Sequence, residues 1–251
     1  MTPHEYLVNV LNSQKMLQED MNKLQNARVG IETQLRIVYG STPRIYYGGS
    51  YGKKTLIRAS FDLDIVIYFP STDYRSLSTI YNSVHQTLRE ANYFVNPKNV
   101  ALRLPYQDGF HIDVVPGRAQ DEIFYYATLY KNEEGSTRQT SIKIHIDNVR
   151  QSNAREIIKL MKLWRLRHTL DWMSFAIELT VIRALAGQAV YDYGDAMTKV
   201  LQFIYNNILT VRLVDPANSN NILEMPLYLR MILQNQAHIS LNSTYWKDIV
   251  W

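Results

Sequence analysis

GGSYGKKTLIRASFDLD, residues 48–64, ends in two carboxylates that open the apolar run Ile65 to Phe69. A short apolar run of this kind predicts a buried strand. Side chains alternate between the two faces of a strand, so Asp62 and Asp64 point to the same face. Two unit negative charges about 4 Å apart repel by about 4 kcal/mol at an effective dielectric of 20. A divalent cation reverses that cost, so the pair predicts a metal site.

The glycines upstream of the carboxylates predict a phosphate site beside the metal. Gly48 and Gly49 let the backbone approach a ligand closely, and a helix that begins at Ser50 would aim free N–H groups at a phosphate. Magnesium favours one or two carboxylates together with substrate phosphates over a cage made by protein alone. The segment therefore predicts a site for a nucleotide with its Mg²⁺.

A third carboxylate follows in GFHIDVVPG, residues 109–117, where polar and apolar residues alternate as on a half-buried strand. Asp113 shares a face with His111, which we interpret as a structural hydrogen-bond partner because phosphoryl transfer needs no histidine base. A strand placed beside Asp62 and Asp64 would complete a three-carboxylate site for two metal ions roughly 3.5 to 4 Å apart. A lone Asp-x-Asp is more often a solvated strand end, and only the combination with Gly-Gly-Ser and Asp113 favours the metal.

The order of these motifs resembles the polymerase-β-type nucleotidyltransferases, whose signature is Gly-Ser, a spacer, Asp-x-Asp on a strand and a later Asp on a neighbouring strand. GSYGKKTLIR (49–58) followed by FDLDIV (61–66) is similar to the oligoadenylate synthases and the cyclic GMP-AMP synthase-like enzymes, especially the bacterial CD-NTases. IKLMKLW (158–164), MSFAIEL (173–179) and VDPANSNN (214–221) resemble further segments of that family, with Ser219 where proline is usual.

The resemblance implies a role for each matching residue. It implies that two Mg²⁺ ions, with Mn²⁺ as a substitute, are held by three catalytic carboxylates: Asp62, Asp64 and Asp113. It also implies that Gly49 and Ser50 bind the terminal phosphates of the donor nucleotide, and that Lys162 and Ser174 bind its triphosphate from a helical lobe.

The resemblance implies an enzyme that transfers nucleotidyl groups from nucleoside triphosphates, with ATP expected, to a ribose hydroxyl and releases pyrophosphate. The product would be a cyclic or linear oligonucleotide, a second messenger of bacterial anti-phage defence that acts on a separate effector protein. One rival function keeps the chemistry and modifies an RNA end or a protein, as toxin-type nucleotidyltransferases do. The other is a catalytically silent nucleotide-binding regulator, against which three intact carboxylates argue.

Without the family resemblance, Lys162 and Ser174 need no role in phosphate binding to be explained. Lys162 follows Lys159 by three residues and Arg155 by seven, so the three form one basic stripe, and such a stripe is usually solvated surface. Ser174 is equally well explained as a helix N-cap. Both alternatives stay open at the level of sequence.

Composition narrows the class of protein. A chain of 251 residues, 46% of them hydrophobic, can bury a sizeable core in one domain or two lobes. The absence of cysteine excludes disulfides and the zinc element of the metazoan DNA sensor, and favours the cytoplasm. A net charge of +4 suits anionic substrates but is too weak to indicate duplex DNA binding. The N-terminus lacks the pattern of a signal peptide and no apolar run is long enough for a membrane span, so we expect no membrane association.

Periodicity predicts an α+β, two-lobed nucleotidyltransferase fold. A long helix is expected over residues 3–38, with a possible break near Gly30, then a helix over 50–57, a strand over 61–69 and an amphipathic helix over 74–91. Residues 100–105 and 110–115 predict a hairpin whose turn is Gln107-Asp108-Gly109. Helices over 149–168, 174–190 and 194–209 and a looser tail from 222 follow. We expect a catalytic lobe with a mixed sheet over residues 1–145 and a helical lobe over 146–251, with the nucleotide in the cleft that they form.

Overall fold

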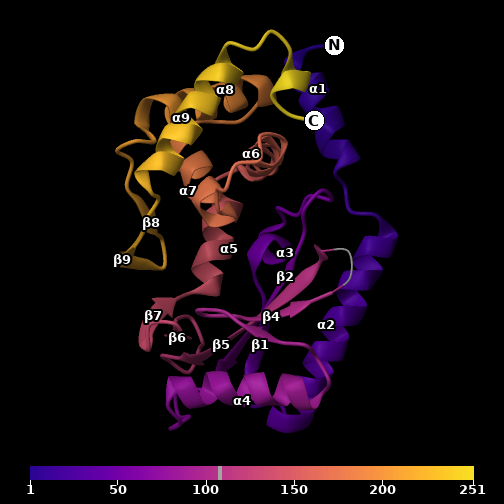
Figure 1. The fold of residues 1–251 in the computed structure, drawn as a ribbon, viewed down its shortest axis with the longest axis vertical. Coiled ribbons are helices and arrows are strands. Elements are labelled where there is room, and N and C mark those ends of the chain that lie inside the picture. The colour runs from indigo at the N-terminus through magenta and orange to yellow at the C-terminus, as the bar shows by residue number, and fades with distance from the viewer. Residues whose placement is uncertain (107–108) are drawn as a thin grey trace. The chain divides into compact units, whose positions relative to one another are not determined.

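The computed structural model describes residues 1–106 and 109–251, and the chain divides into two compact units. We call them the sheet unit, Met16–Lys54 with Ser60–Ile146, and the helical unit, Met1–Lys15 with Thr55–Ala59 and Asp147–Trp251. This content confirms the α+β class, with a mixed sheet and several helices (Figure 1). The predicted division into a catalytic lobe over 1–145 and a helical lobe over 146–251 stays a prediction about function.

The sheet unit is built on one mixed sheet, which has seven strands in the described part of the chain. Its strands are β1 (Arg44–Tyr47), β2 (Leu63–Phe69), β3 (Asn96–Pro97), β4 (Leu102–Pro105), β5 (His111–Ala119), β6 (Ala127–Lys131) and β7 (Ser136–Thr140). The order is β1-β2-β5-β4-β3, with β6 beside β5 and β7 beside β6, and the β2–β5 pair is parallel. The predicted hairpin is confirmed by the antiparallel β4–β5 pair; residues 107 and 108 of its predicted turn lie outside the described residues.

Strand β2 has one fully buried face and one face that ends in the carboxylates. Leu63, Ile65 and Ile67 are completely buried, whereas Asp64 alternates with them on the other face. Helices α2 (Gln18–Tyr39) and α4 (Leu77–Glu90) pack against each other and contact β2 and β5 (Figure 1). The rigid hydrophobic side of the sheet therefore fixes the positions from which the acidic side chains project.

The predicted single helix over residues 3–38 is wrong, because the chain forms α1 (Pro3–Ser13) and then α2. The break lies at residues 14–17 and not at Gly30. The carbonyl of Gln14 accepts a hydrogen bond from Arg58 N at 3.1 Å, and its side chain accepts one from Ala59 N at 3.0 Å. Gly30 lies inside α2, where a Cβ would meet the Tyr93 hydroxyl at 3.2 Å, so close packing explains this glycine.

The chain after residue 141 forms more separate helices than the periodicity predicted. The predicted helix over 149–168 is wrong: α5 (Ile142–Gln151) and α6 (Arg155–Arg167) are separate helices. Asn153 between them has the left-handed φ of 55°, and Ala154 N donates to the Ser152 hydroxyl. The remaining elements are α7 (Ser174–Ala184), α8 (Tyr193–Asn207), β8 (Leu213–Asp215), β9 (Asn218–Leu223), α9 (Leu227–Leu241) and a short 3₁₀ helix (Trp246–Asp248). The tail from residue 222 is therefore ordered.

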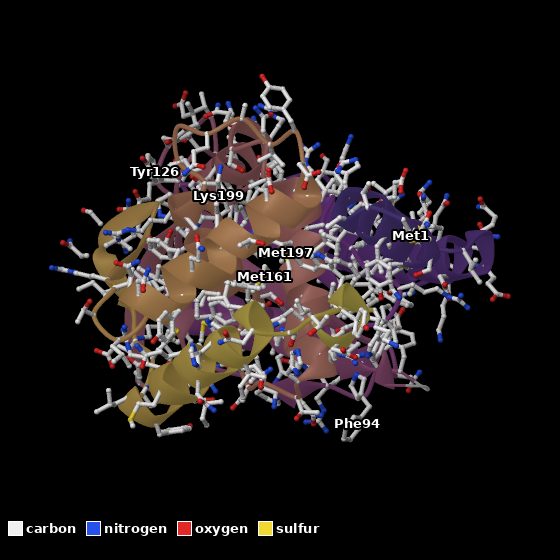
Figure 2. All side chains as sticks on the ribbon, turned by 90° about the horizontal axis from the view of Figure 1, so that it is seen from above. Met1, Phe94, Tyr126, Met161, Met197 and Lys199 are labelled. Carbon is white, nitrogen blue, oxygen red and sulfur yellow. The ribbon has the colours of Figure 1, made fainter. Side chains whose placement is uncertain are left out.

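The core of the helical unit forms around α6. Met161 and Met197, labelled in Figure 2, are completely buried in it together with Trp164. The indole N–H of Trp164 donates to the hydroxyl of Ser240 at 2.9 Å, so this aromatic ring is buried with its polar group satisfied. The first residues of α5 belong to the sheet unit and its last residues to the helical unit, so the chain passes from one unit to the other within this helix (Figure 1).

Among residues 1–106 and 109–251, no helix combines the length and the apolar character that crossing a membrane requires.

Candidate active site

The carboxylates of the candidate site lie on the two parallel strands of the sheet unit. Asp64 on β2 is the register partner of Asp113 on β5, so the two side chains leave the same face of adjacent strands. Asp62 precedes β2 and its carboxylate lies 3.7 Å from Nε2 of His111, which in turn lies 3.9 Å from the carboxylate of Asp113. The predicted neighbourhood of Asp62, Asp64, Asp113 and His111 is thus present in the structure.

Asp113 has a partner that the sequence analysis did not identify. Arg103 on β4 is its register partner on the other side of β5, and the guanidinium binds both carboxylate oxygens, at 2.9 and 2.8 Å. This hydrogen bond raises the pKa of Arg103; the charges of Asp113, Asp62 and Asp64 act in the same direction, and burial opposes them. The alternation of Leu102, Arg103 and Leu104 was the available signal, because it places Arg103 on the polar face of its strand.

The donor set suits a hard divalent cation, since carboxylate oxygens are the ligands that Mg²⁺ prefers. As the side chains stand, no three His, Cys, Asp or Glu residues within the described ranges converge closely enough to coordinate a metal. The ion pair between Arg103 and Asp113 accounts for part of this, because it engages both oxygens of one carboxylate. The strand register is a property of the backbone and favours a site shared by Asp64 and Asp113, whereas both carboxylate oxygens of Asp113 are bound by Arg103.

The Gly-Gly-Ser segment packs directly against Asp64. Gly48 N donates to the carbonyl of Asp64 at 2.8 Å, and helix α3 (Gly49–Lys53) begins at Gly49, one residue before the predicted start at Ser50. Gly49 has a left-handed φ of 51°, and a Cβ there would lie 1.6 Å from Oδ2 of Asp64. Only glycine fits this position. The sequence predicted a close approach of this backbone to a ligand, and in the structure the backbone lies close to the Asp64 carboxylate.

Gly49→Ala is expected to displace the Asp64 carboxylate and to lower turnover by about 100-fold or more, the cost of misplacing a reacting group by roughly 1 Å. Gly40→Ala is the control for backbone strain: its φ is also positive, at 61°, but nothing lies within 4 Å of the added Cβ. With a ψ of −146°, Gly40 has a backbone conformation that few other residues adopt, so strain alone should cost this variant at least as much stability. Thermal melts together with rates on labelled ATP separate the two effects, and equal rates for the two variants would contradict the placement of Gly49.

Lys162 is buried, so the alternative that it belongs to a solvated basic stripe is wrong. Its side chain is 2% exposed, and Nζ donates to both the carbonyl and the hydroxyl oxygen of Thr55, each at 3.1 Å. Lys159, three residues earlier, is partly exposed, with 22% of its side chain accessible, and pairs with Glu156 at 3.0 Å. Helical periodicity alone cannot distinguish these two lysines, because the buried one depends on a contact 107 residues away in the sequence.

Thr55 belongs to a short segment that the helical unit holds in place. Ile57 is part of the hydrophobic core of that unit, and the backbone N–H groups of Arg58 and Ala59 donate to Gln14. The segment lies in the chain between Ser50 and Asp62. The residues that link the predicted phosphate segment to the predicted metal ligands are therefore anchored by Lys162 and Gln14, and neither anchor had a local sequence signal.

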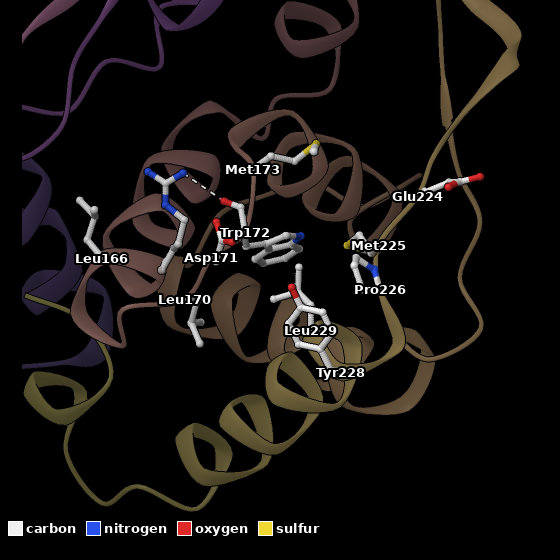
Figure 3. Close-up of a pocket in the computed structure, with 11 residues that line it drawn as sticks. Leu166, Leu170, Asp171, Trp172, Met173, Glu224, Met225, Pro226, Tyr228 and Leu229 are labelled. Atoms are coloured by element: carbon white, nitrogen blue, oxygen red, sulfur yellow. Dashed lines mark hydrogen bonds between the residues drawn. The ribbon is translucent and has the colours of Figure 1, made fainter. Parts of the chain in front are cut away.

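Ser174 is the first residue of α7 and its N-cap is Met173, so the N-cap alternative for Ser174 is wrong. Its hydroxyl accepts a hydrogen bond from Arg165 at 3.1 Å. Arg165 also donates to the carbonyl of Trp172, drawn as the dashed line in Figure 3, and lines a cavity of about 480 Å³ within the helical unit. None of the predicted site residues is among the described residues that line this cavity.

Two curated proteins match the chain by sequence, whereas no family model matches it. The cyclic AMP-AMP-AMP synthase of Escherichia coli (strain MS 115-1) is 25% identical over 193 residues, 69% of this chain and 60% of that protein. The c-di-GMP synthase of Roseivirga ehrenbergii is 34% identical over 108 residues, 41% of this chain and 26% of that protein. The chain thus matches less than two thirds of the length of these relatives.

A solved structure shares the fold over almost the whole chain. The Vibrio cholerae DncV cyclic AMP-GMP synthase, in complex with the linear intermediate 5′ pppA(3′,5′)pG, has a TM-score of 0.82 at 16% identity, covering 99% of this chain and 95% of that chain. This shared fold and the two sequence matches confirm the resemblance to the CD-NTases: the chain is similar in sequence to a cyclic AMP-AMP-AMP synthase and a c-di-GMP synthase, and it has the fold of a cyclic AMP-GMP synthase.

Proposed function

We propose that the chain is a metal-dependent nucleotidyltransferase that joins nucleoside triphosphates into a cyclic or linear oligonucleotide. The observation that carries the proposal is the register pairing of Asp64 with Asp113 while Gly49 is packed against the Asp64 carboxylate. Both sequence relatives make cyclic nucleotide products by name, which supports the same reaction class. A role as a second messenger of anti-phage defence, read by a separate effector, is the finer part of the proposal.

The reaction forms one bond and breaks one bond at the α-phosphorus of the donor. The ribose hydroxyl oxygen of the acceptor bonds to this phosphorus, the hydroxyl proton is lost, and the bond to the leaving pyrophosphate breaks. Asp62, Asp64 and Asp113 would hold divalent cations, with Mg²⁺ expected, and bound cations supply charge neutralisation at the phosphates. Ser50, in the first turn of α3 beside Asp64, would donate to the terminal phosphates of the donor. Lys162 and Ser174 are the further phosphate-binding residues of the proposal.

Purified protein incubated with labelled nucleoside triphosphates and Mg²⁺, then digested with phosphatase, tests this function. Phosphatase-resistant small products are the expected result, and mass spectrometry identifies them. Label on RNA or protein would support a transferase that modifies macromolecules. Absence of turnover with every nucleoside triphosphate would support a regulator instead.

Magnesium alone is expected to change the melting temperature little, because it keeps its waters and binds few carboxylates weakly. Magnesium with a non-hydrolysable ATP analogue at 100 times its Kd stabilises the folded state by about 2.7 kcal/mol through mass action. For a chain of this size that is a rise of about 5 to 10 °C in a thermal melt. Equal shifts with and without the analogue would indicate a structural metal and contradict the proposed substrate complex.

A further inference from the structure

Arg103 binds both oxygens of Asp113, one of the carboxylates of the proposed metal site. Its guanidinium and the carboxylate of Asp113 form two parallel hydrogen bonds, Nε to Oδ1 at 2.9 Å and Nη2 to Oδ2 at 2.8 Å. Such a bidentate arrangement is the strongest form of an Arg–carboxylate contact and fixes both oxygens in one direction. A cation that binds Asp113 must compete for those same oxygens.

The carboxylate that Arg103 binds belongs to an acidic cluster. Asp64 is the register partner of Asp113 on β2, and Nε2 of His111 lies 3.9 Å from the carboxylate of Asp113 and 3.7 Å from that of Asp62. The Arg103 side chain is 38% exposed, so the guanidinium can leave Asp113 for solvent or for another anion. The Asp113 side chain is only 15% exposed and would lose its bidentate partner when Arg103 moves.

We propose that Arg103 is the counter-ion of the metal-free cluster and competes with divalent cations for Asp113. This inference rests on the proposed function, because it assumes that the cluster binds a cation. Arg103 keeps three neighbouring carboxylates stable without metal, at the cost of weak metal binding. A cation that arrives with a triphosphate brings additional ligands, so it displaces Arg103 more readily than a cation alone. Arg103 is thus a positioning residue that couples metal binding to nucleotide binding.

A second ion pair in the sheet unit provides a matched control. Arg75 binds Asp73 in the same bidentate manner, with Nε 3.0 Å from Oδ1 and Nη2 2.6 Å from Oδ2. Side-chain exposures are similar, at 29% and 12%. Asp73 pairs with Arg75 and is not one of the proposed metal ligands. Arg75→Met therefore removes an equivalent pair without touching the proposed metal ligands.

The test is a titration of the full chain with Mn²⁺ in the absence of nucleotide, followed by electron paramagnetic resonance of the free ion. We expect Arg103→Met to bind Mn²⁺ about tenfold more tightly than the parent or better, which corresponds to about 1.4 kcal/mol. Arg75→Met is expected to bind as the parent does. In thermal melts both variants are expected to lose stability, and saturating Mn²⁺ restores it for Arg103→Met alone.

Arg103→Lys keeps the charge but forms a single hydrogen bond, so its Mn²⁺ affinity is expected to lie between those of the parent and Arg103→Met. If Arg103→Met does not fold, this variant decides the question by binding Mn²⁺ more tightly than the parent. Unchanged or weaker binding in the Arg103 variants overturns the inference, and the proposed function stands if Asp64→Asn abolishes Mn²⁺ binding. Parent-like binding by Asp64→Asn removes the metal assignment, and the inference fails with it.

Discussion

Asp64→Asn is expected to lower turnover by about 10³-fold or more while the protein stays folded. The substitution replaces a charged metal ligand with a neutral amide of almost the same shape, so Gly49 can still pack against it. It also relieves the repulsion among neighbouring carboxylates, which removes a cost of folding. Rates of product formation from labelled ATP, with circular dichroism to check the fold, measure the two effects separately.

Asp73→Asn is the control, since it removes a carboxylate of the same unit that pairs with Arg75 and lies outside the proposed site. Its turnover is expected to stay within about tenfold of the parent. Turnover of Asp64→Asn in that same range would mean that this carboxylate does not hold an essential cation.

Local sequence patterns were sufficient for the acidic face of the sheet. The two-residue spacing of Asp62 and Asp64, the apolar run after them and the alternation around Asp113 each depend on strand periodicity alone. The pairing of β2 with β5 then brings Asp64 and Asp113 into register. Gly49 was also predictable as a point of close backbone approach, although what it approaches is the Asp64 carboxylate.

Contacts beyond the local sequence pattern account for what the sequence missed. Arg103 meets Asp113 through the register of β4 with β5, and the predicted hairpin did not specify which residues pair. The end of α1 is fixed by hydrogen bonds from Arg58 and Ala59 to Gln14, with no proline or glycine at the break to signal it. Lys162 has the spacing of a surface stripe, and that spacing gave no sign of its burial.

Lys162→Ala is therefore expected to destabilise the protein, in contrast to what a solvated lysine would do. The lost ammonium donates to two oxygens of Thr55, a residue that is completely buried. Hydrogen bonds to a charged group contribute about 1.5 to 3 kcal/mol, and the Thr55 oxygens would stay buried without this donor. We expect the unfolding free energy to fall by about 3 kcal/mol, which lowers the melting temperature by about 6 to 12 °C.

Lys159→Ala on the same helix is the matched control, because it removes a lysine whose ion pair with Glu156 is partly exposed to solvent. Such a pair contributes about 1 kcal/mol or less, so the melting temperature is expected to change little. Thr55→Val removes one of the two acceptors of Lys162 and keeps the carbonyl, so its loss of stability is expected to lie between the two. If Lys162→Ala and Lys159→Ala have the same melting temperature, the buried contact to Thr55 does not stabilise the folded state.

The proposed role of Lys162 in phosphate binding has a separate readout. If Nζ also donates to the donor triphosphate, the KM for ATP rises about tenfold to a hundredfold in Lys162→Ala, the equivalent of one hydrogen bond to a charged group. Thr55→Val leaves the ammonium in place, so its KM is expected to stay near that of the parent even though its stability falls. A Lys162→Ala protein with lowered stability and an unchanged KM would make Lys162 an anchor of residues 55–59 alone. A raised KM in Lys162→Ala but not in Thr55→Val would show that Lys162 both anchors Thr55 and binds phosphate. Both variants lose the hydrogen bond to the Thr55 hydroxyl, but only Lys162→Ala loses the positive charge.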